Sequence, residues 1–252
     1  MSAHESPSPR LAPLGRRLVA EFLGTGLLVA IVVGSGIAAS ALSPDDIGLQ
    51  LLENSFATTL GLAVLIAVLA PLSGAHFNPV VSLADWWMSR RSTQPGFAAR
   101  DIAPYAVAQA AGAIGGALLA NAMFDIPAAI SATERATPAT FLAEIAATAG
   151  LVLVIFSLTR SGNARMIPAA VGAYIGAAYW FASSTSFANP AVTIGRIFTD
   201  TIAGIAPASA VPFLAAQLLG GVIGVLLVRY LFPVLAGAPD AVIAKETIEV
   251  AK

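Results

Sequence analysis

Long stretches without Asp, Glu, Lys or Arg dominate this chain of 252 residues. A helix that crosses a membrane needs about 20 mostly apolar residues. Five uninterrupted stretches have this length, and two shorter ones join into a sixth across the single charge of Glu144: 22–44, 54–77, 102–124, 166–195, 201–228, and 136–143 with 145–159. Only 11% of the residues are charged, against about a quarter in a soluble domain. The sequence therefore predicts an all-α membrane protein.

Six transmembrane helices are expected from these stretches, each bounded by charged or turn-forming residues. Their expected ranges are 17–42, 50–71, 102–124, 139–159, 166–184 and 208–231. Residues 1–16 form a polar leader with prolines and serines, which we expect to be disordered. The segment that follows is too long for a signal-peptide core and has no convincing cleavage site, so we expect it to be retained.

Charge and residue counts exclude several classes of function. The net charge of −1 leaves no basic surface for a polyphosphate backbone, so nucleic acid is not an expected partner. The chain has no cysteine and two histidines, His4 and His76, which excludes thiolate and histidine-rich metal sites. The sequence contains no recognisable catalytic set in which a nucleophile, a general base and an orienting group would come together at a cavity. We therefore expect neither an enzyme nor a cofactor or bound metal.

The basic residues indicate the orientation in the membrane. Eleven of the thirteen Lys and Arg residues fall on one side: Arg10, Arg16, Arg17, Arg90, Arg91, Arg100, Arg160, Arg165, Arg229, Lys245 and Lys252. The loops of the other side carry several acidic residues and only Arg135 and Arg196. Loops rich in Lys and Arg stay in the cytoplasm, so both termini are expected there, in agreement with an even number of spans.

Three pairs of matching segments indicate an internal duplication of the chain. The pairs are AEFLGTGLLVA (20–30) with AEIAATAGLVLV (143–154), SGAHFNPVVSLADWW (73–87) with STSFANPAVTIGRIF (184–198), and AQAAGAIGGALLA (108–120) with AQLLGGVIGVLLV (216–228). Each half, 17–124 and 139–231, holds three predicted helices and one shorter segment. Because three is odd, the halves must insert with opposite topology, as in the inverted repeats of many transport proteins.

Two segments that carry Asn-Pro are too short to cross a membrane: 77–88 and 188–199. Proline suits the first turn of a helix, because it lacks an amide hydrogen and its φ is fixed. Pro79 and Pro190 are therefore predicted as first helical residues, with Asn78 and Asn189 as N-caps. In an inverted repeat the two half-helices meet near the midplane, with their positive dipole ends on one aqueous path. Such a path repels cations, and the two carboxamides can bind a neutral solute.

At these residues the sequence resembles the aquaporin and aquaglyceroporin family, the major intrinsic proteins, over nearly all of 17–232. The resemblance rests on the two Asn-Pro boxes, the duplicated glutamates Glu21 and Glu144, and the glutamines Gln109 and Gln217. It implies a passive channel domain at 17–233, with six transmembrane helices and two half-helices in an inverted 3+3 repeat. It also implies a cytoplasmic tail at 234–252, a homotetramer with one pore in each protomer, and a place in a bacterial inner membrane. Lipid and small neutral solutes are the expected partners.

The resemblance places a central constriction at the two boxes: Asn78, Pro79, Val80, Asn189, Pro190 and Ala191. The first box reads Asn-Pro-Val, where the family usually has Asn-Pro-Ala. Valine adds a small volume at a packing contact, and we expect the fold to accommodate it.

The outer constriction departs from the family pattern. The family usually has an arginine three residues after the second Asn, where this sequence has Val192. The other three positions, counted without gaps, are Thr58, Ala177 and Ser186. This set of small side chains predicts a wide and weakly polar constriction. A group of bacterial members associated with arsenic resistance looks similar, on GTGLLVAIVVGSGI, SGAHFNP and AAYWF followed by STSFANPAVT. This resemblance implies arsenite as a solute, with glycerol, urea and water also expected.

Several other polar residues have alternative roles. Glu21 and Glu144 suit hydrogen bonds to the backbone before each half-helix, which we favour, or a proton relay. Gln109 and Gln217 are expected to support the structure through hydrogen bonds between helices. His76 is expected in the cytoplasmic vestibule, either as a packed polar side chain or as a group whose protonation gates the pore.

Arg196 lies four residues after Val192 and would share its face on a continuous helix. It would then line the outer vestibule and attract anionic or strongly dipolar solutes. The alternative, which we favour slightly from the spacing, is an i,i+4 pair with Asp200 at the surface.

Two other functions fit parts of the pattern. Broken helices and intramembrane glutamates also occur in proton-coupled secondary transporters. A membrane scaffold with a closed pore is the second alternative. Flux measurements separate the three functions: a channel dissipates only the gradient of its solute, a coupled transporter responds to pH or membrane potential, and a scaffold passes no solute.

Overall fold

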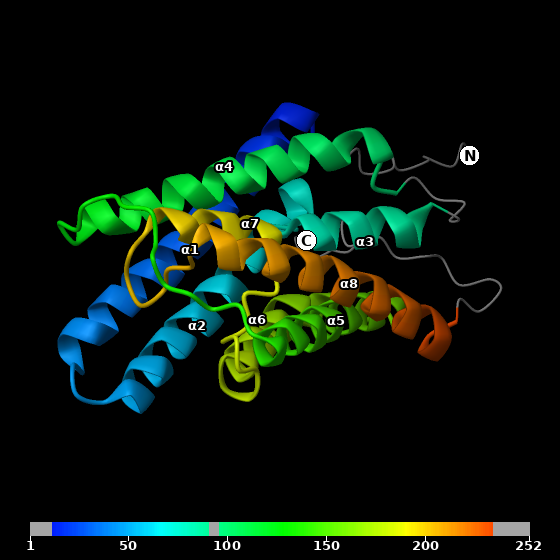
Figure 1. Ribbon diagram of the computed structural model, residues 1–252. Coiled ribbons are helices and arrows are strands. Elements are labelled where there is room, and N and C mark those ends of the chain that lie inside the picture. The colour runs from blue at the N-terminus through cyan, green and yellow to red at the C-terminus, as the bar shows by residue number, and fades with distance from the viewer. Residues whose placement is uncertain (1–11, 91–95, 234–252) are drawn as a thin grey trace, which may run out of the picture.

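The computed structural model describes residues 12–90 and 96–233, which form eight α-helices and two 3-10 turns (Figure 1). These described ranges contain no β-strand, in agreement with the predicted all-α class. The predicted leader lies outside the described residues as far as residue 11, and the predicted tail at 234–252 lies wholly outside them.

Five helices are long and apolar enough to cross a membrane. They are α1 (Leu14–Leu42), α2 (Ile47–Ser73), α4 (Ala99–Met123), α5 (Pro138–Arg160) and α8 (Pro207–Leu231). Each end lies within three residues of the position predicted from the sequence. The start of α2 shows why a boundary moves: Asp46 caps the helix by accepting a hydrogen bond from the amide of Leu49 at 2.9 Å, so the helix begins before residue 50.

The sixth span is shorter than predicted. α6 covers Ile167–Phe181 and follows the 3-10 turn η1 (Ala164–Met166), whereas the sequence predicted a helix as far as residue 184. At about 1.5 Å per residue, α6 alone covers about 22 Å of a hydrocarbon layer of about 30 Å. It ends early because the chain becomes extended at Ala182 and left-handed at Thr185, on its way to the second half-helix.

Two short helices begin at the Asn-Pro pairs. They are α3 (Pro79–Ser89) and α7 (Pro190–Gly195), and the 3-10 turn η2 (Arg196–Phe198) continues α7. The two lie in opposite halves of the bundle along its length (Figure 1). Each packs against both α4 and α8. This arrangement is the one predicted for two half-helices in an inverted repeat.

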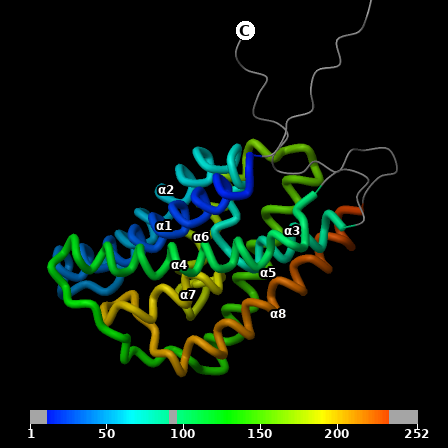
Figure 2. Tube along the Cα trace, turned by 90° about the horizontal axis from the view of Figure 1, so that it is seen from above, coloured from blue at the N-terminus to red at the C-terminus, as the bar shows by residue number. Residues whose placement is uncertain are grey.

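The two repeats pack their first and last long helices in the same way. α1 lies beside α4, and α5 lies beside α8 (Figure 2). A Cβ atom at Gly116 of α4 would lie 2.0 Å from the carbonyl oxygen of Gly26. A Cβ atom at Gly224 of α8 would lie 2.7 Å from the carbonyl oxygen of Ala149. Only glycine permits either close approach, so glycines at equivalent positions allow the two equivalent helix pairs to pack closely.

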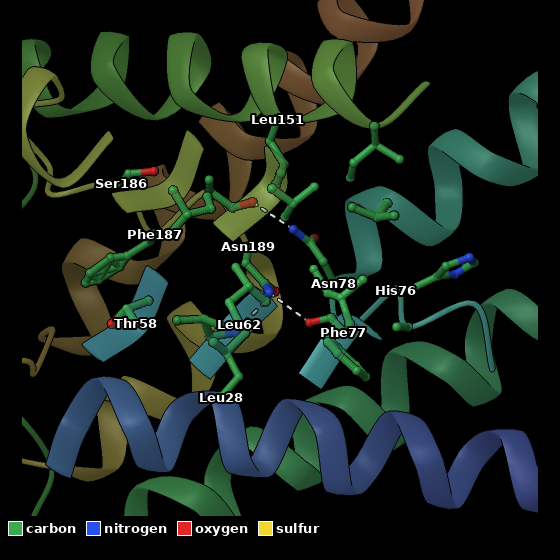
Figure 3. Close-up of a pocket in the computed structure, with 18 of the residues that line it drawn as sticks. Leu28, Thr58, Leu62, His76, Phe77, Asn78, Leu151, Ser186, Phe187 and Asn189 are labelled. Atoms are coloured by element: carbon green, nitrogen blue, oxygen red, sulfur yellow. Dashed lines mark hydrogen bonds between the residues drawn. The ribbon is translucent and has the colours of Figure 1, made fainter. Parts of the chain in front are cut away.

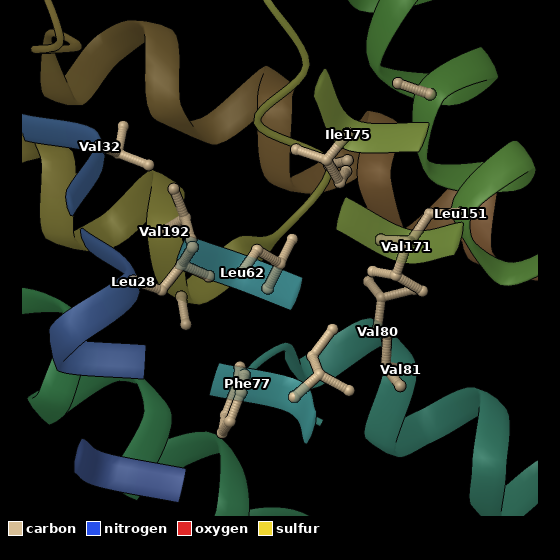
Figure 4. Packing of buried hydrophobic residues seen from close by; sticks show 14 of the residues in the cluster. Leu28, Val32, Leu62, Phe77, Val80, Val81, Leu151, Val171, Ile175 and Val192 are labelled. Atoms are coloured by element: carbon tan, nitrogen blue, oxygen red, sulfur yellow. The ribbon is translucent and has the colours of Figure 1, made fainter. Parts of the chain in front are cut away.

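Val80, the departure from the usual Asn-Pro-Ala box, is buried in the interior of the protein. It belongs to the apolar cluster whose side chains converge between the helices (Figure 4). A Cβ atom at Gly221 of α8 would lie 2.4 Å from Val80 Cγ1. The absence of a side chain at residue 221 thus provides the space that the larger side chain of valine needs.

Candidate functional site

The chain before each half-helix has an irregular backbone. Ala75 and Phe77 both have a φ of 49°, and Ser186 and Ala188 have φ values of 54° and 47°. A left-handed conformation costs a non-glycine residue about 1–3 kcal/mol, so the surroundings must stabilise each of these loops. The same alternation of conformations in both loops follows from the internal duplication.

A buried glutamate holds the first irregular loop. Glu21 accepts hydrogen bonds from the backbone amides of His76 and Phe77 at 3.0 and 2.7 Å. Ser73 Oγ and Gln109 Nε2 donate to the same carboxylate at 2.6 and 2.7 Å. Each carboxylate oxygen therefore accepts two hydrogen bonds, and the side chain has no exposed surface.

Glu144 holds the second loop in the same way. It accepts hydrogen bonds from the backbone amides of Phe187 and Ala188 at 2.9 and 2.8 Å. Ser184 Oγ and Gln217 Nε2 both donate to it at 2.6 Å. Buried amides without partners are costly in a medium of low polarity, and these carboxylates supply the missing acceptors. Neither glutamate lines the cavity described below.

The two asparagines connect the two repeats through hydrogen bonds (Figure 3). The Oδ1 atom of each accepts a hydrogen bond at 2.9 Å from a backbone amide in the first turn of its own half-helix. Asn78 Nδ2 donates to the carbonyl oxygen of Ala188, and Asn189 Nδ2 donates to that of Phe77, both at 2.8 Å. A carboxamide nitrogen carries two hydrogens, so one N–H of each asparagine remains for a solute.

A cavity runs past both loops, with His76 toward one end and Ser186 toward the other (Figure 3). Most of its wall is aliphatic, from helices of both repeats: Leu28, Val32, Leu62, Leu151, Ile155, Val171 and Ile175. Polar groups face it at the two asparagines and at both ends. Among the described residues, the lining includes no Asp or Glu. The cavity thus offers a path with an apolar wall and a few hydrogen-bonding groups.

Only two of the six residues expected at the central constriction line this cavity, namely Asn78 and Asn189. Val80 and Ala191 are buried in the apolar cluster behind them. The two prolines occupy the first position of each half-helix, outside the lining. The correction follows from helix geometry, because successive residues of a helical turn point in different directions and only one faces the cavity.

Three of the four residues expected at the outer constriction line the cavity: Thr58, Ser186 and Val192. The structure corrects the fourth. Ala177 is exposed on the outside of α6, and Tyr179 faces the cavity in its place, with its hydroxyl oxygen 3.1 Å from Thr58 Oγ1. Residue 177 was predicted by counting along the sequence without gaps. Ala177 and Tyr179 are two residues apart, which corresponds to a rotation of about 200° around the helix axis, so they lie on nearly opposite faces of α6.

Replacing Tyr179 with alanine is expected to increase glycerol flux severalfold relative to water flux, because it removes the largest side chain at this constriction. Ala177→Leu is the matched control, since it adds volume on the outer face of the same helix. Both ratios can be measured by light scattering of proteoliposomes after osmotic shock. An altered ratio in Ala177→Leu together with an unchanged ratio in Tyr179→Ala would contradict this assignment.

Arg196 lies at the end of the cavity where Phe187 and Ser186 are found. It is 4% exposed and lines the cavity. Its guanidinium carbon lies 3.4 Å from the centroid of the Phe187 ring, and Nε donates a hydrogen bond to the carbonyl oxygen of Ala203. The aromatic face and the carbonyl hold the guanidinium group to one side of the path.

The pair between Arg196 and Asp200, favoured from the spacing, is wrong for the residues that the structure describes. No ion pair forms between them, and Asp200 Oδ1 instead accepts a hydrogen bond from the amide of Ala132 at 3.0 Å. The i,i+4 spacing requires a continuous α-helix. Here α7 ends at Gly195, and the tighter turn η2 changes the direction of the chain.

His76 lines the opposite end of the cavity and is held at both ring nitrogens. Nδ1 lies 3.0 Å from Ser82 Oγ, and Nε2 lies 3.2 Å from Asp85 Oδ2. The rings of Phe97 and Tyr105 pack against it, with centroids 4.9 and 5.5 Å away. These contacts match the packed polar role, one of the two alternatives for this residue.

Asn189→Asp is expected to weaken the exclusion of cations, because it places a negative charge at the positive ends of both half-helices. It also replaces Nδ2, which donates to the carbonyl of Phe77, with a second acceptor. Proton and potassium leak should therefore rise in proteoliposomes of the variant, and fluorescent dyes inside the vesicles measure both. A leak as low as that of the unmodified protein, in a folded variant, would contradict the meeting of the half-helices at the path.

Two half-helices that meet beside an enclosed cavity, within an inverted repeat of apolar helices, define a membrane channel fold. The model of the major intrinsic protein family matches residues 10–186. The chain belongs to this family. Its members are channels, and the chain is an integral membrane protein with several spans.

Individual relatives cover most of the chain. It is 52% identical over 219 residues to the aquaglyceroporin AqpS of Rhizobium meliloti, covering 86% of this chain and 91% of that protein. It is 30% identical over 256 residues to the glycerol uptake facilitator protein of Escherichia coli, covering 87% of each. The aquaglyceroporin structure from Plasmodium falciparum has the same fold, with a TM-score of 0.65 over 88% of this chain and 97% of the other, at 23% identity.

Proposed function

We propose that this chain is a passive channel for small neutral solutes, with an outer constriction formed by Thr58, Tyr179, Ser186 and Val192. The solutes are glycerol, urea, water and arsenite in its neutral trihydroxy form. The observation that carries this proposal is the cavity itself, which has valine at the position of the family's usual arginine and reaches both crossed asparagines. Without a large cation projecting from residue 192, the path is wide enough for solutes larger than water.

The relatives support the same class of solute. AqpS carries the name aquaglyceroporin, and the Escherichia coli relative is named for glycerol uptake. A propanediol uptake facilitator of Citrobacter freundii is 39% identical over 44% of this chain. Glycerol and propanediol are small neutral polyols, which suit an aliphatic wall with a few hydrogen-bonding groups.

The positions of the two buried glutamates favour a channel over a proton-coupled transporter. A proton relay needs a carboxyl group that meets the solute path. Glu21 and Glu144 instead accept four hydrogen bonds each, and neither lines the cavity. Their role in this proposal is structural support, together with Gln109 and Gln217.

The proposal extends to assembly and orientation. Large apolar side chains are exposed on the outer faces of α1, α2 and α8, where lipid or neighbouring subunits would cover them: Val19, Leu27, Phe56, Val64, Val211 and Leu226. We infer a homotetramer in the bacterial inner membrane with both termini in the cytoplasm. His76 then faces the cytoplasmic vestibule, and Arg196 faces the outside.

Stopped-flow light scattering of proteoliposomes tests the range of solutes. Vesicles with and without protein are exposed in turn to gradients of glycerol, urea and arsenite, and water flux is measured with sucrose. We expect faster re-swelling than in protein-free vesicles for each small solute. Water flux without flux of any larger solute would contradict the wide constriction, and no flux at all would favour the closed scaffold.

A further inference from the structure

We propose that the outer end of this pore is a binding site for small monoanions with a carboxylate or another oxyanion group, and that Arg196 is its main ligand-binding residue. The site goes beyond the passage of neutral solutes, because a bound anion would occupy the path that those solutes use.

Arg196 is a buried cation without a counter-ion. It is 4% exposed, and no carboxylate in the described part of the chain lies within ion-pair distance of it. Its Nε–H group donates to the carbonyl oxygen of Ala203, so four N–H groups on the two Nη atoms remain for a ligand. A planar guanidinium group with free donors matches a carboxylate, which accepts two parallel hydrogen bonds. A buried charge of this kind is costly unless a ligand compensates it.

A second guanidinium group lies against the same aromatic ring. Arg135, from the loop between α4 and α5, has its guanidinium carbon 5.5 Å from the centroid of the Phe187 ring. It is fixed by a hydrogen bond from Nε to the carbonyl oxygen of Gly204 at 2.6 Å. Burial lowers the pKa of Arg135 from its ordinary value, and its charge repels that of Arg196. Two cations held close together without a carboxylate between them strengthen the attraction for an anion.

Neutral donors near Arg196 complete the site. Ser186 Oγ is buried, lines the cavity and has no hydrogen-bond partner. The hydroxyl groups of Tyr179 and Thr58 lie on the same stretch of the wall and contact each other at 3.1 Å. A hydroxyl group can donate to a bound anion or accept from the hydroxyl of a hydroxy acid. The site therefore suits a small carboxylate with a neighbouring hydroxyl group.

The acidic residues near this end are already engaged. Glu144 is a carboxylate whose charge acts on Arg196, and both its oxygens accept hydrogen bonds from the second loop. In the outer loops, Glu134 Oε2 accepts from Ser209 Oγ at 2.6 Å, and Asp200 accepts from the amide of Ala132. None of the three lines the cavity, so an anion at Arg196 meets no carboxylate in the wall.

Lactate is a suitable probe, because lactamide has the same skeleton without the charge. Binding of each is measured by ligand-observed NMR with the whole protein in lipid nanodiscs. We expect lactate to bind more tightly than lactamide. Arg196→Ala should weaken the affinity for lactate at least about tenfold, which is the effect expected from the loss of one charge-assisted hydrogen bond. The affinity for lactamide should not change. Arg196→Lys should retain part of the affinity, because it keeps the charge.

Arg165→Ala is the matched control, since it removes an exposed positive charge from the 3-10 turn η1 before α6. Equal affinities for lactate and lactamide in the unmodified protein would overturn the proposal, as would equal lactate affinities in Arg196→Ala and Arg165→Ala. If Arg196→Ala does not fold, the anion site is tested with Arg196→Gln and with the comparison of lactate and lactamide binding to the unmodified protein.

A second readout connects the site with flux. External lactate should slow the uptake of 1,2-propanediol by proteoliposomes more than lactamide does at equal ionic strength. The inhibition is expressed relative to each variant's own uptake, so a changed basal flux does not affect it. Lactate that binds without slowing uptake would place the site outside the path and overturn the proposal. An absence of propanediol uptake would contradict the neutral channel instead, and the NMR measurement would still test the anion site.

Discussion

Val192→Arg is expected to reduce glycerol and arsenite flux about tenfold or more, with a smaller loss of water flux. Val192 lines the same cavity as Thr58 and Ser186, with which we propose that it forms the outer constriction. An arginine there would project a long cation into the path that Thr58, Tyr179 and Ser186 also line. Because pore diameter limits the larger solutes first, their barrier should rise by more than about 1.4 kcal/mol, which corresponds to tenfold in rate.

The control for Val192→Arg is Val192→Leu, which adds volume without charge and should lower glycerol flux only modestly. The glycerol and water fluxes of the two variants are compared by stopped-flow measurements on proteoliposomes with the same protein-to-lipid ratio. Equal loss of water and glycerol flux in Val192→Arg would indicate a misfolded protein, which size-exclusion chromatography detects independently. Unchanged glycerol flux in a folded variant would show that residue 192 does not form the constriction.

Glu144→Ala is expected to abolish the accumulation of folded protein. The carboxylate accepts two backbone hydrogen bonds and two side-chain hydrogen bonds in a fully buried position. Leaving a buried donor without a partner costs about 1–3 kcal/mol, and four such losses approach the whole stability of a typical protein, about 5–15 kcal/mol. The yield of monodisperse protein in detergent measures this outcome.

Two variants serve as controls for Glu144→Ala. Glu21→Ala should have the same effect, because Glu21 makes the equivalent four hydrogen bonds in the first repeat. Asp45→Ala removes an exposed carboxylate and should leave the yield unchanged. A normal yield of Glu144→Ala, together with altered pH dependence of flux, would instead support a proton relay at this residue.

The parts of the site that could be predicted are those that the duplication repeats. Asn78 and Asn189 occupy equivalent positions, and so do Glu21 and Glu144. If Asn-Pro only marked a loop, or if a glutamate served only as a proton relay, one copy of each would be enough. Their occurrence at equivalent positions in both halves therefore indicated a structural role common to the two repeats. Helix ends were also predictable to within three residues for the five long helices, since charge and apolar length determine where a chain leaves a membrane.

The parts that could not be predicted depend on local turns. Tyr179 lines the cavity and Ala177 does not, because the rotation of α6 about its axis is set by its packing, which a count along the chain does not include. The choice between the two alternatives for Arg196 also could not be made: it lines the cavity and does not pair with Asp200, because α7 stops after Gly195. The crossed hydrogen bonds of the asparagines depend on two left-handed loops meeting in space, and no local pattern in the sequence encodes that meeting.

The central claim, passive passage of small neutral solutes through this cavity, is tested most directly by glycerol influx into proteoliposomes under imposed gradients. Influx is measured with no gradient of pH or potential, with a pH gradient, and with a potassium diffusion potential set by valinomycin. The account predicts an influx well above that of protein-free vesicles, proportional to the glycerol gradient and equal under all three conditions. An influx that depends on the pH gradient or the potential, or one no faster than in protein-free vesicles, would contradict it.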